Sequence, residues 1–194
     1  MIAFLKGNFV HKSPALVHID VNGVGYEVHI SLNTYSDITG LDHGLLHTYF
    51  HVREDAQLLY GFSEHAEKEM FIQLISVSGV GASTARMMLS SLKPVEIASA
   101  ITQGNTKLLE SIKGIGRKSA ERIVLELRDK VGKVGTESNN EVLINNSLDQ
   151  DALNALIALG INKSAGEQAV ARVRKSNPEL YKIEDIIKQA LKNI

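Results

Sequence analysis

Apolar and polar residues alternate along the first third of the chain, and this pattern predicts short β-strands. Two alternating runs flank Asn22-Gly23, a residue pair typical of a tight β-hairpin turn. Two more runs, 47–52 and 57–62, predict a second strand pair. About five short strands within residues 1–62 favour a small closed barrel such as an OB-fold.

From residue 63 onward the apolar positions recur every three or four residues, which is typical of amphipathic helices. Ser63 is expected to cap the first of these helices, because its hydroxyl can accept a hydrogen bond from an amide of the first turn. Pro94 is expected in the first turn of a later helix. The block 63–132 is therefore predicted to be an all-helical domain.

One stretch of this block has the form of a helix-hairpin-helix, in which Gly114-Ile115-Gly116 separates two helical runs. Glycines permit a sharp turn and a close approach to another surface. The helix that follows begins with unpaired amides and a positive dipole end, which suits a phosphate group. Arg117 and Lys118 stand at this point, so the stretch predicts a phosphate-binding site.

The same pattern occurs 35 residues earlier, where Gly79-Val80-Gly81 precedes a second apolar stripe. A single turn of this kind can also be purely structural, with solvated basic residues beside it. A structural turn does not need both glycines and the whole stripe twice. Two copies suit two phosphate runs, one on each strand of a duplex.

The last quarter of the chain predicts a separate small domain. Residues 133–148 are rich in Gly, Ser, Asn and acidic residues and are expected to form a flexible linker. Residues 149–194 contain three apolar helical runs, with Ser164 as an expected cap and Pro178 between the last two. A three-helix domain of this size on a tether favours a docking role.

The distribution of charge along the chain is more informative about function than the overall composition. The net charge of the 194 residues is only −1, but residues 105–133 hold eight basic residues against four acidic ones. Residues 1–62 hold three basic and six acidic residues, so one face can bind DNA while another repels it.

The chain has no Cys, no leader-like start and no apolar run of membrane-spanning length, so a cytoplasmic location without membrane contact is expected.

The sequence predicts no catalytic residue, metal or cofactor. His47 and His51 are not part of a zinc-binding motif, because the chain has no Cys and no HExxH pattern. The residue before Lys118 is not the glycine that a P-loop requires. Glu54 and Asp55 are expected at a hairpin tip, where they are either ordinary polar turn residues or a pair of carboxylates that repels phosphates. A nuclease site would need further acidic ligands, and the sequence identifies none.

Three stretches in this order carry a family resemblance: VREDAQLLYGF (52–62), the two glycine turns GVG and GIGRKSAER, and ALNALIALGI (152–161). Together they resemble the RuvA family, the junction-binding subunits of the bacterial RuvAB branch-migration complex. The resemblance covers essentially the whole chain. It implies an α+β multidomain protein with an N-terminal OB-fold β-barrel, a tandem helix-hairpin-helix domain and a C-terminal three-helix, UBA-like domain.

The resemblance also implies a role without catalysis: a homotetramer that holds a four-way (Holliday) DNA junction open and flat. Whether one or two tetramers bind each junction stays open. Glu54 and Asp55 would form an acidic pin at the junction centre. Residues 149–194 would dock the RuvB motor, which supplies ATP hydrolysis, and the RuvC resolvase is a further candidate partner.

In that family the two hairpins contact phosphates, which assigns the contacts by position. The assigned backbone donors are Gly79, Val80, Gly81, Gly114, Ile115 and Gly116, with side-chain contacts from Ser83, Arg117 and Lys118.

This chain departs from the family in its first hairpin, where Ala82-Ser83 replaces a common Pro-Lys pair. That hairpin is expected to bind phosphate more weakly, with Arg86 as a candidate substitute cation. One alternative, a helix-hairpin-helix repair enzyme (a glycosylase or a nuclease), uses the same hairpins. Another, a plain tetrameric structural protein, leaves the repeated hairpins unexplained.

Overall fold

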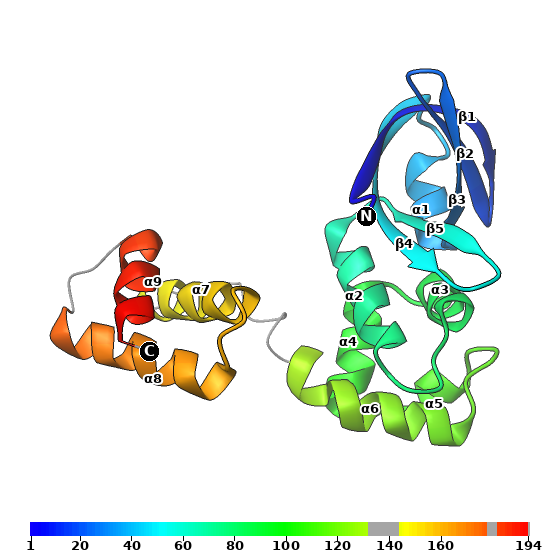
Figure 1. The fold of residues 1–194 in the computed structure, drawn as a ribbon. Helices are drawn as coiled ribbons and strands as arrows, with labels where there is room; N and C mark the ends of the chain where they lie inside the picture. Colours follow the sequence, from blue (N-terminus) through cyan, green and yellow to red (C-terminus); the bar gives the residue numbers. More distant parts are fainter. Residues whose placement is uncertain (132–143, 178–181, 194) are drawn as a thin grey trace. The chain divides into compact units, whose positions relative to one another are not determined.

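The computed structural model describes residues 1–131, 144–177 and 182–193, which fall into two compact units (Figure 1). The first unit contains the barrel and the helices that follow it, up to residue 131. The second contains the helices from residue 144 onward. Residues 133–143 of the predicted linker lie outside the described residues, whereas residues 144–148, also predicted as linker, are the first turn of a helix.

A closed five-stranded barrel forms the N-terminal part of the first unit. Its strands are β1 (Phe4–Ser13), β2 (Leu16–Val21), β3 (Val24–Ile30), β4 (His43–Val52) and β5 (Gln57–Phe62). The barrel order is β1-β2-β3-β5-β4, in which only β3 and β5 pair in parallel. The predicted OB-fold barrel is confirmed. Asn22 and Gly23 join β2 to β3 with φ angles of 53° and 87°, as a type I′ turn requires.

One element of the barrel was not predicted, the helix α1 (Leu32–Ile38) between β3 and β4. It has seven residues, which is too short for a clear helical period in the sequence. Ser31 caps it by accepting a hydrogen bond from the Thr34 amide at 3.0 Å. Its last residue, Ile38, is buried in the barrel core, so α1 closes one end of the barrel.

The helical part of the first unit packs against the end of β5. Its helices are α2 (His65–Ile75), α3 (Ala82–Ser91), α4 (Pro94–Gln103), α5 (Thr106–Glu110) and α6 (Arg117–Val131). Pro94 occupies the first turn of α4, as predicted. Tyr60 and Phe62 of β5 belong to the core of these helices, where their rings lie 5.1 Å and 5.0 Å from that of Phe71.

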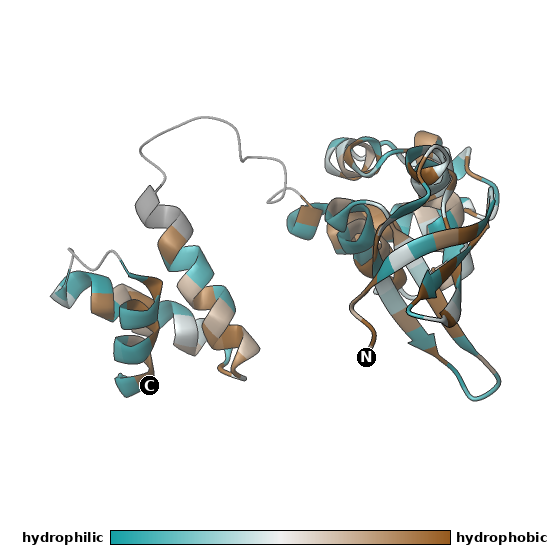
Figure 2. Ribbon diagram, turned by 90° about the horizontal axis from the view of Figure 1, so that it is seen from above, coloured by the Kyte–Doolittle hydropathy of each residue, from teal (hydrophilic) through white to brown (hydrophobic). Residues whose placement is uncertain are grey.

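The first unit therefore has two cores, one inside the barrel and one among the helices, joined through β5. Figure 2 shows hydrophobic and hydrophilic residues alternating along the strands, as expected for strands with one buried face.

Ser63 does not cap α2, so that prediction is wrong. The cap position is Glu64, and the Ser63 hydroxyl instead donates to Asp37 Oδ2 at 2.5 Å.

The second unit is a three-helix cluster, as predicted. Its helices are α7 (Ile144–Ala158), α8 (Lys163–Ser176) and α9 (Ile183–Lys192). Asn162, rather than Ser164, caps α8 by accepting a hydrogen bond from the Ser164 amide at 2.9 Å. Gly166 allows α7 and α8 to pack closely, because a Cβ there would lie 2.9 Å from Leu153 Cδ1.

Candidate nucleic-acid interface

The two predicted hairpins have the same backbone geometry. The amide of Val80 donates to the Val77 carbonyl at 3.0 Å, and the amide of Ile115 donates to the Ile112 carbonyl at 3.0 Å. Both side chains are buried, at 5% exposure each. The amides of Val80 and Ile115 therefore each make a hydrogen bond within their turn, and the predicted phosphate contact from these amides would have to share or replace that bond.

The two glycines of each hairpin serve different purposes. Gly79 and Gly114 have φ angles of 90° and 94°, a backbone conformation that favours glycine. Gly81, in contrast, has a φ of −83°, which any residue adopts, and Gly116 is not among the positive-φ residues of the described chain. A Cβ added at Gly81 or Gly116 would meet no atom within 4 Å. Neither a positive φ nor internal packing thus requires glycine at these two positions.

Unpaired backbone amides gather at the same two positions. In α3 the first helical hydrogen bond runs from the Ala85 amide to the Gly81 carbonyl, and in α6 it runs from the Ala120 amide to the Gly116 carbonyl, both at 2.9 Å. The amides just before them, at 81–84 and 116–119, have no hydrogen-bond acceptor within residues 1–131. Each hairpin therefore presents a set of free N–H donors at a positive helix end.

Side chains differ more than the backbone between the two hairpins. Arg117 lies 81% exposed and is paired with Glu121, its Nε 2.9 Å from Glu121 Oε1. Lys118 is exposed and forms no ion pair within residues 1–131. Ser83, at the matching place in the first hairpin, is exposed and has only a hydroxyl to offer.

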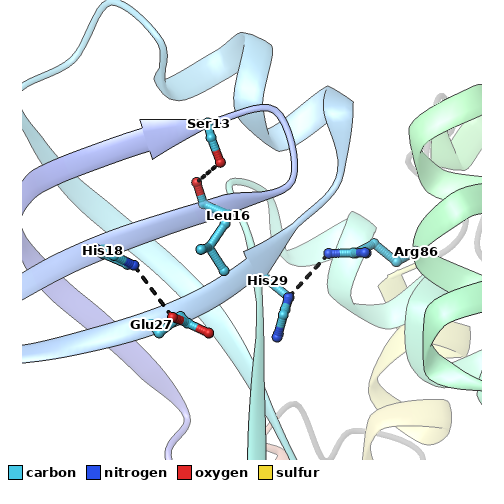
Figure 3. Close-up of polar contacts among 6 residues, drawn as sticks. All are labelled: Ser13, Leu16, His18, Glu27, His29 and Arg86. Carbon is cyan, nitrogen blue, oxygen red and sulfur yellow. Dashed lines mark hydrogen bonds and ion pairs between the residues drawn. The ribbon is translucent and has the colours of Figure 1, made fainter.

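Arg86, the candidate substitute cation, points to the barrel instead (Figure 3). Its Nη1 donates to the Ala15 carbonyl at 3.0 Å and lies 3.3 Å from His29 Nδ1. Burial, and then the neighbouring guanidinium, lower the pKa of His29 below its ordinary value, while Glu27 opposes them. Arg86 thus fastens α3 to the barrel, a role that sequence reasoning missed because the contact joins distant segments.

A buried carboxylate makes a second connection between barrel and helices. Glu67 of α2 is 2% exposed and accepts hydrogen bonds from the hydroxyls of Ser31 and Thr34, the latter at 2.6 Å. Burial raises the pKa of Glu67 above its ordinary value, and the two hydroxyls oppose this rise. The amide of Ser63 completes the network by donating to Thr34 Oγ1 at 3.0 Å.

The predicted acidic tip lies on the turn between β4 and β5. Arg53 and Ala56 close the turn, with the Arg53 amide 2.8 Å from the Ala56 carbonyl. Glu54 and Asp55 between them are exposed and form no ion pair within residues 1–131. The one neighbouring cation, Arg53, donates through Nε to His51 Nε2 at 2.8 Å. Both carboxylates therefore remain uncompensated at the tip.

Two further features of the described residues concern metal ions and membranes. No group of three or more His, Asp or Glu side chains is placed there to hold one metal ion. No helix in the described ranges is both long enough and apolar enough to cross a bilayer.

Comparison with known proteins covers all parts of the chain. The family model "RuvA N terminal domain" matches residues 1–61, "SAM-like Helix-hairpin-helix tandem" matches residues 71–129, and "RuvA, C-terminal domain" matches residues 148–194. Similar curated proteins come from Christiangramia forsetii and Flavobacterium psychrophilum, each 45% identical over the full length of both chains. Another, from Cytophaga hutchinsonii, is 43% identical over 99% of both. All three are named Holliday junction branch migration complex subunit RuvA.

Proposed function

This chain belongs to the RuvA family, and on that premise we propose that it binds four-way DNA junctions as a homotetramer. The tetramer holds the four arms open and flat, and acts in the cytoplasm in recombination and DNA repair. The protein itself is not catalytic. Its partner, an ATPase of the RuvB kind, drives branch migration.

The observation that carries the proposal is a pair of glycines that neither a positive φ nor internal packing requires. Gly81 and Gly116 stand where free amides gather, and neither backbone conformation nor internal packing demands them. A phosphate that approaches the backbone closely explains both facts, because a Cβ would stand in its way. Two such sites in one compact unit suit the two strands of one duplex arm.

The role of the acidic tip follows from charge. Glu54 and Asp55 are exposed and unpaired within the first unit, so they repel DNA phosphates that approach the tip. On a linear duplex such a tip opposes binding. At the centre of a four-fold junction, where strands cross over, it instead helps to keep the strands apart.

The three-helix unit is the proposed docking site for the motor subunit. It has a core of its own, formed by residues of α7, α8 and α9, and it is matched as a family domain in its own right. Residues 152–194 hold seven basic and four acidic residues, so weak contact with DNA is a secondary role. A resolvase of the RuvC kind is a further partner for the open junction.

A competition gel-shift tests the proposal, with a four-way junction and a linear duplex of equal total length at one fixed salt concentration. The junction should bind more tightly, and the complex should have the mass of one or two tetramers. Equal binding of the two DNAs would rule out the junction-binding role. Cleavage of DNA or excision of a base by the purified protein alone would favour a repair enzyme instead.

A further inference from the structure

The two hairpins have the same backbone geometry but carry different charges. Lys113, Arg117 and Lys118 surround the turn of the second hairpin, while the three matching positions of the first hairpin carry no charged residue. Two of these cations have an assigned role under the proposed function. Lys113 has none.

Arg86 of α3 does not replace the missing charges, because the barrel holds it. Its Nη1 donates to the Ala15 carbonyl at 3.0 Å. An ionic contact between Arg86 and DNA would first have to break this bond.

Lys113 occupies the outer side of the second turn. Ile112 and Ile115 flank this turn and are only 4% and 5% exposed, so both ends of the turn face the core. Lys113 and Gly114 between them are exposed. Lys113 forms no hydrogen bond or ion pair within residues 1–131, in contrast to Arg117, which is held by Glu121.

We propose that Lys113 is an additional phosphate-binding residue of the second hairpin, and that this hairpin supplies most of the ionic part of DNA affinity. The proposal rests on the function proposed above, since it concerns the same interface. Its ligand is the sugar-phosphate backbone of duplex DNA. Phosphates follow one another at about 3.4 Å of helix axis along each strand, so cations around one turn meet neighbouring phosphates of one strand.

Counterion release makes the proposal measurable. Each cation that neutralises a phosphate adds about 0.9 to the negative slope of log K against log salt on duplex DNA. Lys113 and Lys118 can add this effect in full, because no carboxylate of the described first unit has to be displaced from them. Arg117 adds less, because binding a phosphate must compete with its bond to Glu121.

The test measures binding of the full chain to a linear duplex between about 50 and 200 mM salt, the range over which such slopes are resolved. Lys113→Ala and Lys118→Ala should each make the slope shallower by about one unit, and Lys113→Arg should keep it. Lys130→Ala is the matched control. It removes an exposed lysine at the other end of α6, about 20 Å along the helix from Arg117, and should leave the slope unchanged.

An unchanged slope for Lys113→Ala would overturn the inference, and so would an equal loss in Lys130→Ala, which would indicate a general effect of net charge. Ser78→Lys serves as a second variant should Lys113→Ala lower the thermal midpoint. It places a lysine at the matching position of the first hairpin and should steepen the slope by about one unit, and no steepening would overturn the inference. A wild-type protein that binds junction and duplex equally would defeat the proposed function, while the slopes on linear duplex would still decide the role of Lys113.

Discussion

The side-chain amide nitrogen of Asn33 lies 2.6 Å from the carbonyl oxygen of Leu89 and 3.2 Å from that of Leu92. Both carbonyls belong to the C-terminal end of α3, where helix carbonyls lack partners within the helix. The other end of α3 presents the free amides of the first hairpin. One barrel residue of α1 therefore fixes the helix that positions half of the proposed DNA interface.

Asn33→Ala should lower the free energy of unfolding by about 1–3 kcal/mol, because part-buried carbonyls lose their donor. Urea unfolding measures this change. Asn8→Ala is the control, since Asn8 is exposed and its side chain makes no hydrogen bond within residues 1–131. An equal effect of the two substitutions would show that the bonds from Asn33 contribute nothing to stability.

Alanine at the hairpin glycines should separate folding from binding. Gly114→Ala should cost about 1–2 kcal/mol of stability, because φ there is 94°. Gly116→Ala should change stability by less than about 0.5 kcal/mol. It should nevertheless weaken DNA binding by about tenfold, the loss of roughly one charge-assisted hydrogen bond. Thermal melts and duplex titrations check the pair, and wild-type DNA affinity in Gly116→Ala would remove this turn from the interface.

Neutralising the acidic tip should not weaken junction binding. In the double variant Glu54→Gln with Asp55→Asn, affinity for a four-way junction should stay the same or rise, because repulsion of phosphates is removed. The rate of motor-driven branch migration should change. Asp42→Asn, which neutralises an exposed carboxylate elsewhere on the barrel, should change neither quantity. A large loss of affinity in the double variant would contradict a repulsive role.

Glu67 should make stability depend on pH. Its folded-state pKa is raised by burial, so the folded protein holds this proton more tightly than the unfolded chain does. The contribution is fully present below the unfolded pKa, near 4.5, and is lost as pH rises through the folded pKa. The wild type should therefore lose stability relative to Glu67→Gln as pH rises from that value. Parallel denaturant curves across this range would contradict the prediction.

Removal of the three-helix unit should separate DNA binding from motor stimulation. The deletion should begin at residue 144, because α7 starts there and a cut at 149 would leave its first turn behind. Junction affinity should stay close to that of the full chain, and stimulation of the ATPase should be lost. Stimulation that survives the deletion would place the docking surface in the first unit.

Local patterns in the sequence were enough to predict most elements of the fold. The Asn22-Gly23 turn, the Pro94 helix start and the two glycine hairpins all depend on residues close together in the chain. Their conformations follow from backbone sterics and helical spacing, which act over a few residues. The 35-residue repeat predicted two similar turns, and their hydrogen bonds are indeed the same.

Contacts between distant segments were decided only by the tertiary structure. The sequence alone allowed Arg86 to face DNA, but the Ala15 carbonyl and His29, brought close by the barrel, hold it instead. The sequence also gave no sign that Glu67 is buried, because its partner Ser31 lies 36 residues away in the chain and the two meet only in the folded protein. Side-chain partners of this kind are set by packing, whereas turns and periods are set by the local chain.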